Sequence, residues 1–288
     1  MSLKTMLVTG CSAGGIGAAI ALALSQRGHH VFATARTVHK IPSELSKLAN
    51  VTLLPLDVTS SESVAEAAQT VAASGRGLDV LINNAGAGYA MPVLDVNISR
   101  AQKLYDVNVW GPIRMVQAFA DLLITSRGRI VNLSTVGAVL NTPWISTYAS
   151  SKAALTNYSE TMRLELAPFG VTVVTIMAGS IYSHFHDNDG DGDFALPPTS
   201  RYVPIEEIIA GWADGSSKPK GCTAMQFAES LIDDVLITGK LSMAYKGPYA
   251  GIMKFVSTWA PQSLADAALS YNQGLNELTE KVRKENRS

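Results

Sequence analysis

Short apolar runs recur along the first two thirds of the chain, and each is rich in Val, Ile, Leu or Thr. They lie at Thr5–Thr9, His30–Ala35, Val51–Leu56, Leu78–Ile82, Arg129–Leu133 and Val171–Met177. An apolar run of about four to eight residues is typical of a strand that is buried on both faces. The pattern therefore predicts a buried strand at each of these positions.

The segments between these runs have helical spacing and are rich in Ala, Leu, Ser and Glu. They include Ile16–Arg27, Ser61–Ala73, Arg100–Ser126 and Ser146–Ala167. Strand and helix thus alternate, as they do when parallel strands are joined by right-handed helical crossovers. We expect an α/β fold with a doubly wound parallel sheet of about seven strands.

The pattern changes after Met177. Residues 178–202 are polar and rich in Gly and Asp, and helices are expected from Pro204 and from Thr223. We interpret residues 178–240 as a lid over a substrate. The chain shows no internal repeat and no linker composition, so residues 1–288 are expected to form a single domain.

The end of the chain predicts one more strand, Leu241–Tyr245, and a helical tail over 246–288. Pro248 and Pro261 interrupt the tail, which favours two short helices. The apolar stretch Ile252–Trp259 is expected to pack against the sheet. Contact with lipid or with a partner subunit is the alternative.

Composition excludes several classes of protein. Lysine and arginine number 23 against 24 acidic residues, a net charge of −1 at pH 7, so no general basic excess favours nucleic acid. Cys11 and Cys222 match no metal-ligand or disulfide framework, which favours a reducing, cytoplasmic location. We expect neither a secretory signal nor a transmembrane segment.

A metal site is not expected either. Residues 187–192 imitate the start of a calcium loop, but the position that needs a bidentate Glu is Pro198. His184 and His186 have no convincing third ligand nearby.

The first chemical signal is a glycine-rich turn between the first strand and the first helix. Such a turn lets backbone N–H groups approach a phosphate, and the helix N-terminus adds partial positive charge. The alternative is a turn without a ligand. The residues expected to bind a cofactor here are Gly10, Ser12, Gly15, Ile16 and Gly17.

The end of the second strand suggests which cofactor is bound. An NAD site would place an acid there, but the chain has Ala35 and Arg36. A guanidinium can grip a 2′-phosphate, so NADPH or NADP⁺ is expected, unless Arg36 is only a solvated loop charge. Further cofactor-binding candidates lie at the ends of the third and fourth strands: Asp57, Val58, Asn84, Ala85 and Gly86. Asp57 is expected near the adenine, and Asn84 is expected to hold the backbone beside the ribose.

Tyr148 and Lys152 are the candidates for proton transfer. Residues four apart share a helix face. An ammonium and an oxidised nicotinamide would together bring the pKa of Tyr148 from about 10 toward neutrality, so that it could exchange a proton with a carbonyl oxygen. The alternative is a pair of surface side chains.

Three more residues are candidates for the reacting end. Ser134 and Thr135 end the fifth strand and bring hydroxyl groups to the same edge of the sheet. Asn108 falls inside an expected helix, where its amide can hold a water molecule if the helix is distorted. Alone, Asn108 would be an ordinary polar residue.

Together these motifs resemble those of the short-chain dehydrogenase/reductase family over about the first two thirds of the chain: Thr9-Gly10…Gly15-Ile-Gly17, Asn83-Asn-Ala-Gly86, Asn108, the hydroxyls of Ser134 and Thr135, and Tyr148-x-x-x-Lys152. The resemblance implies a Rossmann sheet and hydride transfer at nicotinamide C4. It also implies Tyr148 as acid/base, Lys152 on the nicotinamide ribose, Asn108 in a proton relay, and a homodimer or homotetramer.

The sequence departs from the family pattern at several points. The glycine turn is one residue longer, which leaves Gly14 and Gly15 as alternatives for the middle glycine. The family spacing puts Thr135 at the catalytic serine position, with Ser134 in reserve. After the sixth strand, Ala178-Gly179 replaces Pro-Gly, and Ser183 stands where a threonine often contacts the carboxamide. Gly179, Ile181 and Ser183 are the cofactor-binding candidates that the resemblance implies in this segment.

The segment from Tyr245 to Val256 also resembles the NADPH-dependent 1-acyldihydroxyacetone-phosphate reductases. Related ketoreductases act on natural products. The lid favours that second class. Between residues 180 and 203 it carries four aspartates, and Arg201 is the one Arg or Lys residue opposing them: Asp187, Asp189, Asp191 and Asp193. Their negative charge would repel a phosphate ester.

The expected function is that of a cytoplasmic NADPH-dependent reductase in secondary or lipid metabolism. Its substrate would be a small molecule with a ketone or aldehyde group, lipid-like or a natural-product intermediate. The alternatives are alcohol oxidation by the same site and an NADPH-binding sensor or scaffold without turnover.

Overall fold

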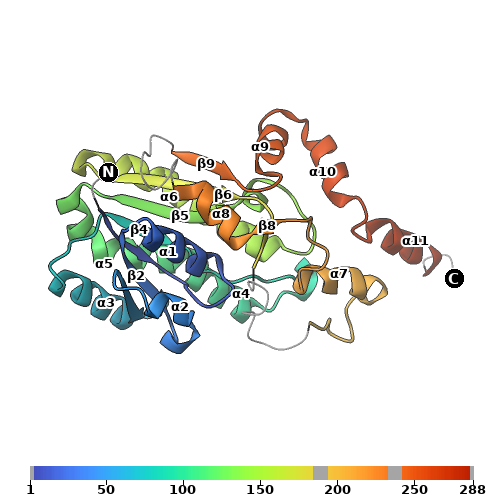
Figure 1. The fold of residues 1–288 in the computed structure, drawn as a ribbon. Coiled ribbons are helices and arrows are strands. Elements are labelled where there is room, and N and C mark those ends of the chain that lie inside the picture. The colour runs from blue at the N-terminus through green and yellow to red at the C-terminus, as the bar shows by residue number, and fades with distance from the viewer. Residues whose placement is uncertain (1–2, 184–193, 233–241, 286–288) are drawn as a thin grey trace.

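A computed structural model describes residues 3–183, 194–232 and 242–285 of the chain (Figure 1). Its centre is a seven-stranded parallel sheet in the order β3-β2-β1-β4-β5-β6-β9. The strands are β1 Thr5–Val8, β2 His30–Ala35, β3 Val51–Pro55, β4 Val80–Asn83, β5 Arg129–Thr135, β6 Thr172–Ala178 and β9 Met243–Lys246. The predicted doubly wound sheet is confirmed.

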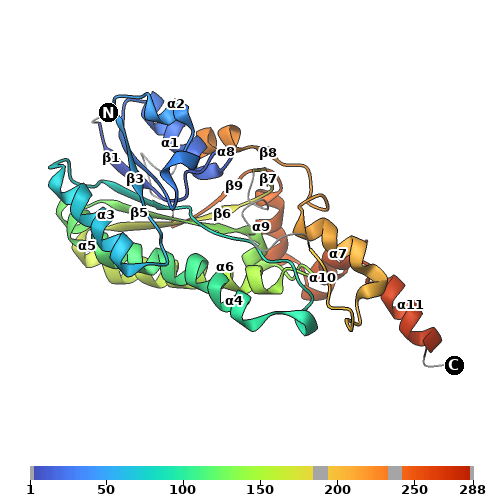
Figure 2. The same cartoon turned by 90° about the horizontal axis from the view of Figure 1, so that it is seen from below.

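Helices cover both faces of this sheet (Figure 2). One face carries α1 Ile16–Gln26, α2 Ser43–Ser46 and α8 Ala224–Leu231, and the other carries α3 Ser61–Ala73, α5 Gly111–Ser126 and α6 Ser146–Leu166. Alternate strand residues serve the two faces: Met6 and Val8 pack toward α1, while Leu7 packs toward α5. Because strand side chains alternate, fully apolar strands are what two covered faces require.

The helix predicted over Arg100–Ser126 is interrupted. It consists of α4 Ile98–Tyr105, a π-helical turn Asp106–Trp110, and α5. A π turn widens the helix by one residue and is often found at functional sites.

The region after β6 contains short elements. β7 Ile181–Tyr182 pairs with β8 Cys222–Thr223, and α7 Glu206–Ala213 lies within the residues expected in the lid. Thr223 caps α8 through a reciprocal hydrogen bond with Gln226. The aspartates at 187–193, His184 and His186 lie outside the described residues.

Within residues 246–285, the part of the tail that the structure describes, there are three helices, so the prediction of two is wrong. These are α9 Ala250–Trp259, α10 Gln262–Ser270 and α11 Leu275–Glu285. Pro261 separates α9 from α10, as expected, but a second break follows at Asn272 and Gly274, which both have positive φ. No proline marks this break, so it was missed.

Three large apolar residues of α9 are exposed, so the prediction that Ile252–Trp259 packs against the sheet is wrong for them. Ile252, Phe255 and Trp259 are 59%, 63% and 74% exposed. The helix docks instead through Ala250, which is 1% exposed. Among the helices that the structure describes, none is long and apolar enough to cross a bilayer.

Candidate active site

A cavity of about 990 Å³ follows the carboxyl edge of the sheet. Parallel α/β sheets bind their ligands at this edge. Most of the candidate residues line it: Gly10, Ser12, Gly15, Ile16, Arg36, Asp57, Val58, Asn84, Ala85, Gly86, Ser134, Thr135, Tyr148, Lys152, Gly179, Ile181 and Ser183. Gly17 and Asn108 lie behind this lining.

The glycine turn is shaped for close backbone approach. Gly10 has a φ of +73° and Gly14 a φ of +71°, a region of backbone conformation that strongly favours glycine. Gly15 precedes α1 and lines the cavity. A Cβ at Gly17 would overlap the Gly10 carbonyl oxygen, so its role is packing beneath the turn.

Asn84 fastens the turn to the end of β4. Its Nδ2 donates to the carbonyl oxygens of Thr9 and Gly10 at 2.8 and 3.1 Å. Thr9 Oγ1 in turn accepts hydrogen bonds from the backbone N–H groups of Asn84 and Ala85 at 3.0 and 2.9 Å. These bonds hold the backbone, which is the role expected of Asn84.

The edge beside β2 is cationic. Arg36 follows the buried Ala35, and Lys40, which the sequence did not single out, lines the same part of the cavity as Ser12. Asp57 lies across from them after β3, where its Oδ1 accepts hydrogen bonds from Thr59 N and Thr59 Oγ1 at 2.9 and 2.7 Å.

At the reacting end, Tyr148 and Lys152 lie on one face of α6 and line the cavity together. Lys152 is 5% exposed, and its Nζ donates to the Leu133 carbonyl oxygen at 2.9 Å. Burial lowers the pKa of Lys152 to about 8. The ammonium is therefore easier to deprotonate than that of an ordinary lysine.

Burial raises the pKa of Tyr148 to about 12, and a hydrogen bond with the Thr135 side chain offsets only part of this rise. Removing the phenolate from water is the larger effect. The expected lowering toward neutrality depends on an oxidised nicotinamide beside the phenol, so it stays a prediction. The phenol keeps its proton, which is the form that a proton donor needs.

The two neighbouring hydroxyls have different surroundings. Thr135 donates to the Ala178 carbonyl oxygen at 3.2 Å and also bonds Tyr148. Ser134 is 4% exposed and bonds Thr156 Oγ1 and the Lys152 carbonyl oxygen at 2.7 and 3.2 Å. Thr135 therefore shares the proton-transfer end with Tyr148, while Ser134 fastens β5 to α6.

Asn108 is fully buried in the π-helical turn, so the helix is distorted as expected. Its Oδ1 accepts from Ala87 N at 2.9 Å, and its Nδ2 donates to Ala87 O and Ser151 Oγ, both at 3.0 Å. The amide is thus bonded to protein through both its oxygen and its nitrogen, and the expectation that it also holds a water molecule stays a prediction. Gly86 separates it from Lys152, because a Cβ there would lie 3.2 Å from Asn108 Oδ1 and 3.4 Å from Lys152 Nζ.

The segment after β6 is held close to the tail. A Cβ at Gly179 would overlap the Pro248 carbonyl oxygen, so only glycine fits. Ser180 Oγ donates to the Pro219 carbonyl oxygen at 2.6 Å and draws residues 217–219 against this segment. Ile181 and Ser183 line the cavity beside them.

Sequence reasoning missed the far end of the cavity. Its wall includes Trp212 and Lys218 from the expected lid, and Met253, Leu269 and Gln273 from the tail. Burial lowers the pKa of Lys218 to about 8. No sequence motif marks these residues. The charged side chain of Lys218 was the one signal that could have made it a candidate, once the fold placed it beside the cavity.

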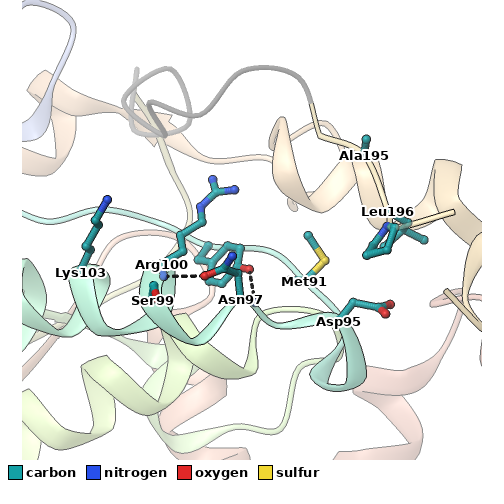
Figure 3. A pocket seen from close by; sticks show the side chains of 10 residues that line it. Met91, Asp95, Asn97, Ser99, Arg100, Lys103, Ala195 and Leu196 are labelled. Carbon is teal, nitrogen blue, oxygen red and sulfur yellow. Dashed lines mark hydrogen bonds between the residues drawn. The ribbon is translucent and has the colours of Figure 1, made fainter. Parts of the chain in front are cut away.

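A second cavity, of about 530 Å³, lies near α4 (Figure 3). Tyr89 lines both cavities, and the Arg100 guanidinium lies 4.5 Å from the centre of its ring. Asn97 Oδ1 accepts from Arg100 N at 3.0 Å.

Among the described residues, no group of three His, Cys, Asp or Glu side chains could hold a metal ion.

Comparisons with known proteins agree with this geometry. A family model for short chain dehydrogenases matches residues 4–192. The short-chain dehydrogenase ptmH of Penicillium ochrochloron is 42% identical over 267 residues, which cover 92% of this chain and 96% of that protein.

Two further similarities bear on the cofactor. The NADPH-dependent 1-acyldihydroxyacetone phosphate reductase of Schizosaccharomyces pombe is 39% identical over 246 residues, covering 84% of this chain and 82% of that one. A crystal structure of a short chain dehydrogenase from Burkholderia cenocepacia in complex with NADP has a TM-score of 0.73 and 26% identity, covering 93% and 98% of the two chains.

Proposed function

The chain belongs to the short-chain dehydrogenase/reductase family and is an oxidoreductase that acts on CH–OH groups, and we propose that it works as an NADPH-dependent reductase of ketones or aldehydes. The observation that carries the proposal is the cluster of Tyr148, Thr135 and Lys152 on the wall of a cavity whose other end has the glycine turn and Arg36. Its relatives bind NAD(P).

The selection of NADPH rests on the end of β2. Arg36 and Lys40 line the cavity, and no carboxylate follows Ala35 to repel a 2′-phosphate. The glycine turn leaves room for a pyrophosphate, since Gly10 and Gly15 place no side chain there. The expected contacts of Gly179, Ile181 and Ser183 with the nicotinamide end belong to the same proposal.

Reduction requires a proton donor beside the hydride donor. When bound, the dihydronicotinamide supplies the hydride. Tyr148 Oη donates its proton to the substrate's carbonyl oxygen. Thr135 Oγ1 is bonded to the phenol and, by turning its hydrogen from the Ala178 carbonyl oxygen to the substrate's oxygen, holds the two in line. The Lys152 ammonium then stabilises the phenolate that remains, and Asn108 keeps Gly86 and the turn around it in place for the relay of the next proton.

The proposed substrate is a lipid-like or natural-product ketone. The cavity wall beyond Tyr148 carries Leu140, Ile145, Met253 and Leu269, which suit an apolar molecule. Of the residues expected in the lid, α7 and residues 217–219 border this cavity and act as its lid in this proposal, whereas α8 packs on the sheet with α1. The similarity to a 1-acyldihydroxyacetone phosphate reductase leaves a phosphate ester as the alternative substrate class.

A homodimer or homotetramer is part of the proposal. Trp110 and Tyr158 are 45% and 42% exposed beside each other, with ring centres 6.0 Å apart, and Leu164 of α6 is 64% exposed. Exposed apolar residues clustered on two helices are typical of an interface between subunits. The cytoplasmic location expected from the two cysteines stays a prediction.

The test is transfer of deuterium from NADPH labelled at nicotinamide C4. Incubation with a panel of apolar ketones and aldehydes should give alcohols that carry deuterium on the carbinol carbon, measured by mass spectrometry. Faster turnover of the matching alcohols with NADP⁺ would favour oxidation as the physiological direction. Tight NADPH binding without any turnover would favour a sensor or scaffold and overturn the proposal.

A further inference from the structure

The tail of the chain forms part of the cavity that holds the reacting groups. Met253 of α9 and Leu269 of α10 line it, and so does Gln273 in the turn before α11. Figures 1 and 2 show α9, α10 and α11 running past the carboxyl end of the sheet toward α7. The far wall of the cavity is therefore made by residues distant in sequence from the catalytic motifs.

Gln273 joins this tail to two other parts of the wall. Trp212 of α7 donates from its indole Nε1 to Gln273 Oε1 at 2.6 Å. Trp144, in the loop before α6, donates from its Nε1 to the Gln273 backbone oxygen at 3.1 Å. Trp144 is 7% exposed and lies in the connection that leads directly into α6, which carries Tyr148, so the bonds fix Gln273 relative to the catalytic helix.

These bonds also determine which way the Gln273 amide faces. An indole N–H can only donate, so the amide oxygen must face Trp212 and the amide nitrogen must face away from it. Among the described residues, Nε2 has one contact, with the Tyr271 carbonyl oxygen at 3.5 Å, which is the long limit for such a bond. Gln273 thus presents an oriented N–H donor with capacity for a further acceptor.

The surroundings of this donor are mostly apolar. Leu140, Ile145 and Met253 line the same end of the cavity, and Lys218 belongs to the segment that Ser180 ties to the cofactor candidates. Thr142, Ser217 and Lys218 also line the cavity, but Gln273 is the donor whose direction a second side chain fixes. An oriented donor discriminates between ligands, because a substrate without an acceptor leaves the donor unpaired.

We propose that Gln273 is a specificity-determining residue, and that the substrate is an apolar ketone with a second, neutral acceptor oxygen remote from the carbonyl that is reduced. The Gln273 Nε2–H group donates to that distant oxygen. Trp212 is a positioning residue, since it acts on the substrate only through the orientation of the amide. This inference rests on the proposed reductase function and adds the substrate class.

The test uses 2-undecanone and its ether analogues, in which one CH₂ group is replaced by oxygen at successive positions along the chain. The wild-type enzyme should prefer one ether position over 2-undecanone by about tenfold or more in kcat/KM, the size expected for one hydrogen bond to a neutral group in an apolar site. Gln273→Glu keeps an oxygen for Trp212 but removes the donor, so it should abolish this preference.

Two controls separate specificity from folding. Gln69→Glu makes the same chemical change on the exposed face of α3 and should leave the preference intact. Trp212→Phe removes the indole donor and keeps a ring, so it should weaken the preference through free rotation of the amide. The preference is read within each variant, as the ratio of kcat/KM for the ether ketone to kcat/KM for 2-undecanone, so a loss of activity common to both substrates cancels.

The outcomes differ from those of the functional proposal. If the wild-type enzyme reduces no ketone, the reductase proposal fails and this inference fails with it. If 2-undecanone is reduced but no ether position is preferred, or the preference survives both substitutions, the reductase function stands and the role of Gln273 is refuted.

Discussion

The hydroxyl group that assists Tyr148 can be identified by comparing two adjacent residues. Thr135 Oγ1 bonds the phenol, whereas Ser134 Oγ bonds Thr156 and the Lys152 backbone. Thr135→Val keeps the branched shape and removes the hydroxyl. Loss of one donor to the reacting oxygen typically lowers kcat by roughly 100- to 1,000-fold, and we expect this range for Thr135→Val.

Ser134→Ala should affect mainly stability. The serine hydroxyl makes two buried bonds, but Thr156 keeps its own bond to the Lys152 carbonyl oxygen at 2.8 Å. We therefore expect a loss of about 1–3 kcal/mol in the free energy of unfolding and a kcat within about threefold of wild type.

The assay is steady-state NADPH oxidation with one ketone, together with denaturant unfolding of each variant. Thr135→Ser, which restores the hydroxyl without the methyl group, should recover most of the lost kcat. The assignment is refuted if Ser134→Ala loses kcat as severely as Thr135→Val while both variants remain folded.

Three further predictions concern the cofactor, the pH dependence and the tail. Arg36→Asp should lower kcat/KM with NADPH at least about tenfold and raise it with NADH, and an unchanged ratio between the two cofactors would contradict the assignment of Arg36. Burial lowers the pKa of Lys152 to about 8, and its ammonium form is the active one, so kcat/KM for reduction should fall as the pH rises through 8. A pH profile that is flat there would exclude the role of Lys152 in stabilising the phenolate. Gly179→Ala places a Cβ against the Pro248 carbonyl oxygen and should lower the free energy of unfolding by about 1–3 kcal/mol, measured by thermal unfolding. Gly251→Ala, whose Cβ would have nothing within 4 Å, is the control that should not be destabilised.

The sheet could be predicted because its strands are buried on both faces. The pattern placed β2 at His30–Ala35 and α3 at Ser61–Ala73, as in the structure. Local composition decides such elements, since a strand covered on both sides must be apolar throughout. The break before α11 depends instead on the positive φ of Asn272 and Gly274, which no proline announces.

The candidate site was predictable only where motifs define it. The glycine turn, Tyr148 and Lys152 have fixed spacing on single elements, and the structure brings them to one cavity. Gln273 enters through contacts with Trp144 and Trp212, which are set by tertiary packing and leave no local signal. The burial that raises the pKa of Tyr148 is likewise set by tertiary packing, since the sequence shows the nearby charge but not the extent of burial.

The central claim is that the Tyr148 phenol donates a proton to the substrate, while other residues of the cavity hold the cofactor. The most direct measurement compares Tyr148→Phe with the wild-type enzyme in two quantities, the Kd for NADPH and kcat for ketone reduction. We expect a Kd within about threefold and a kcat lower by roughly 100- to 10,000-fold, the usual contribution of a positioned proton donor. A folded Tyr148→Phe enzyme that reduces the ketone as fast as the wild type would contradict the claim.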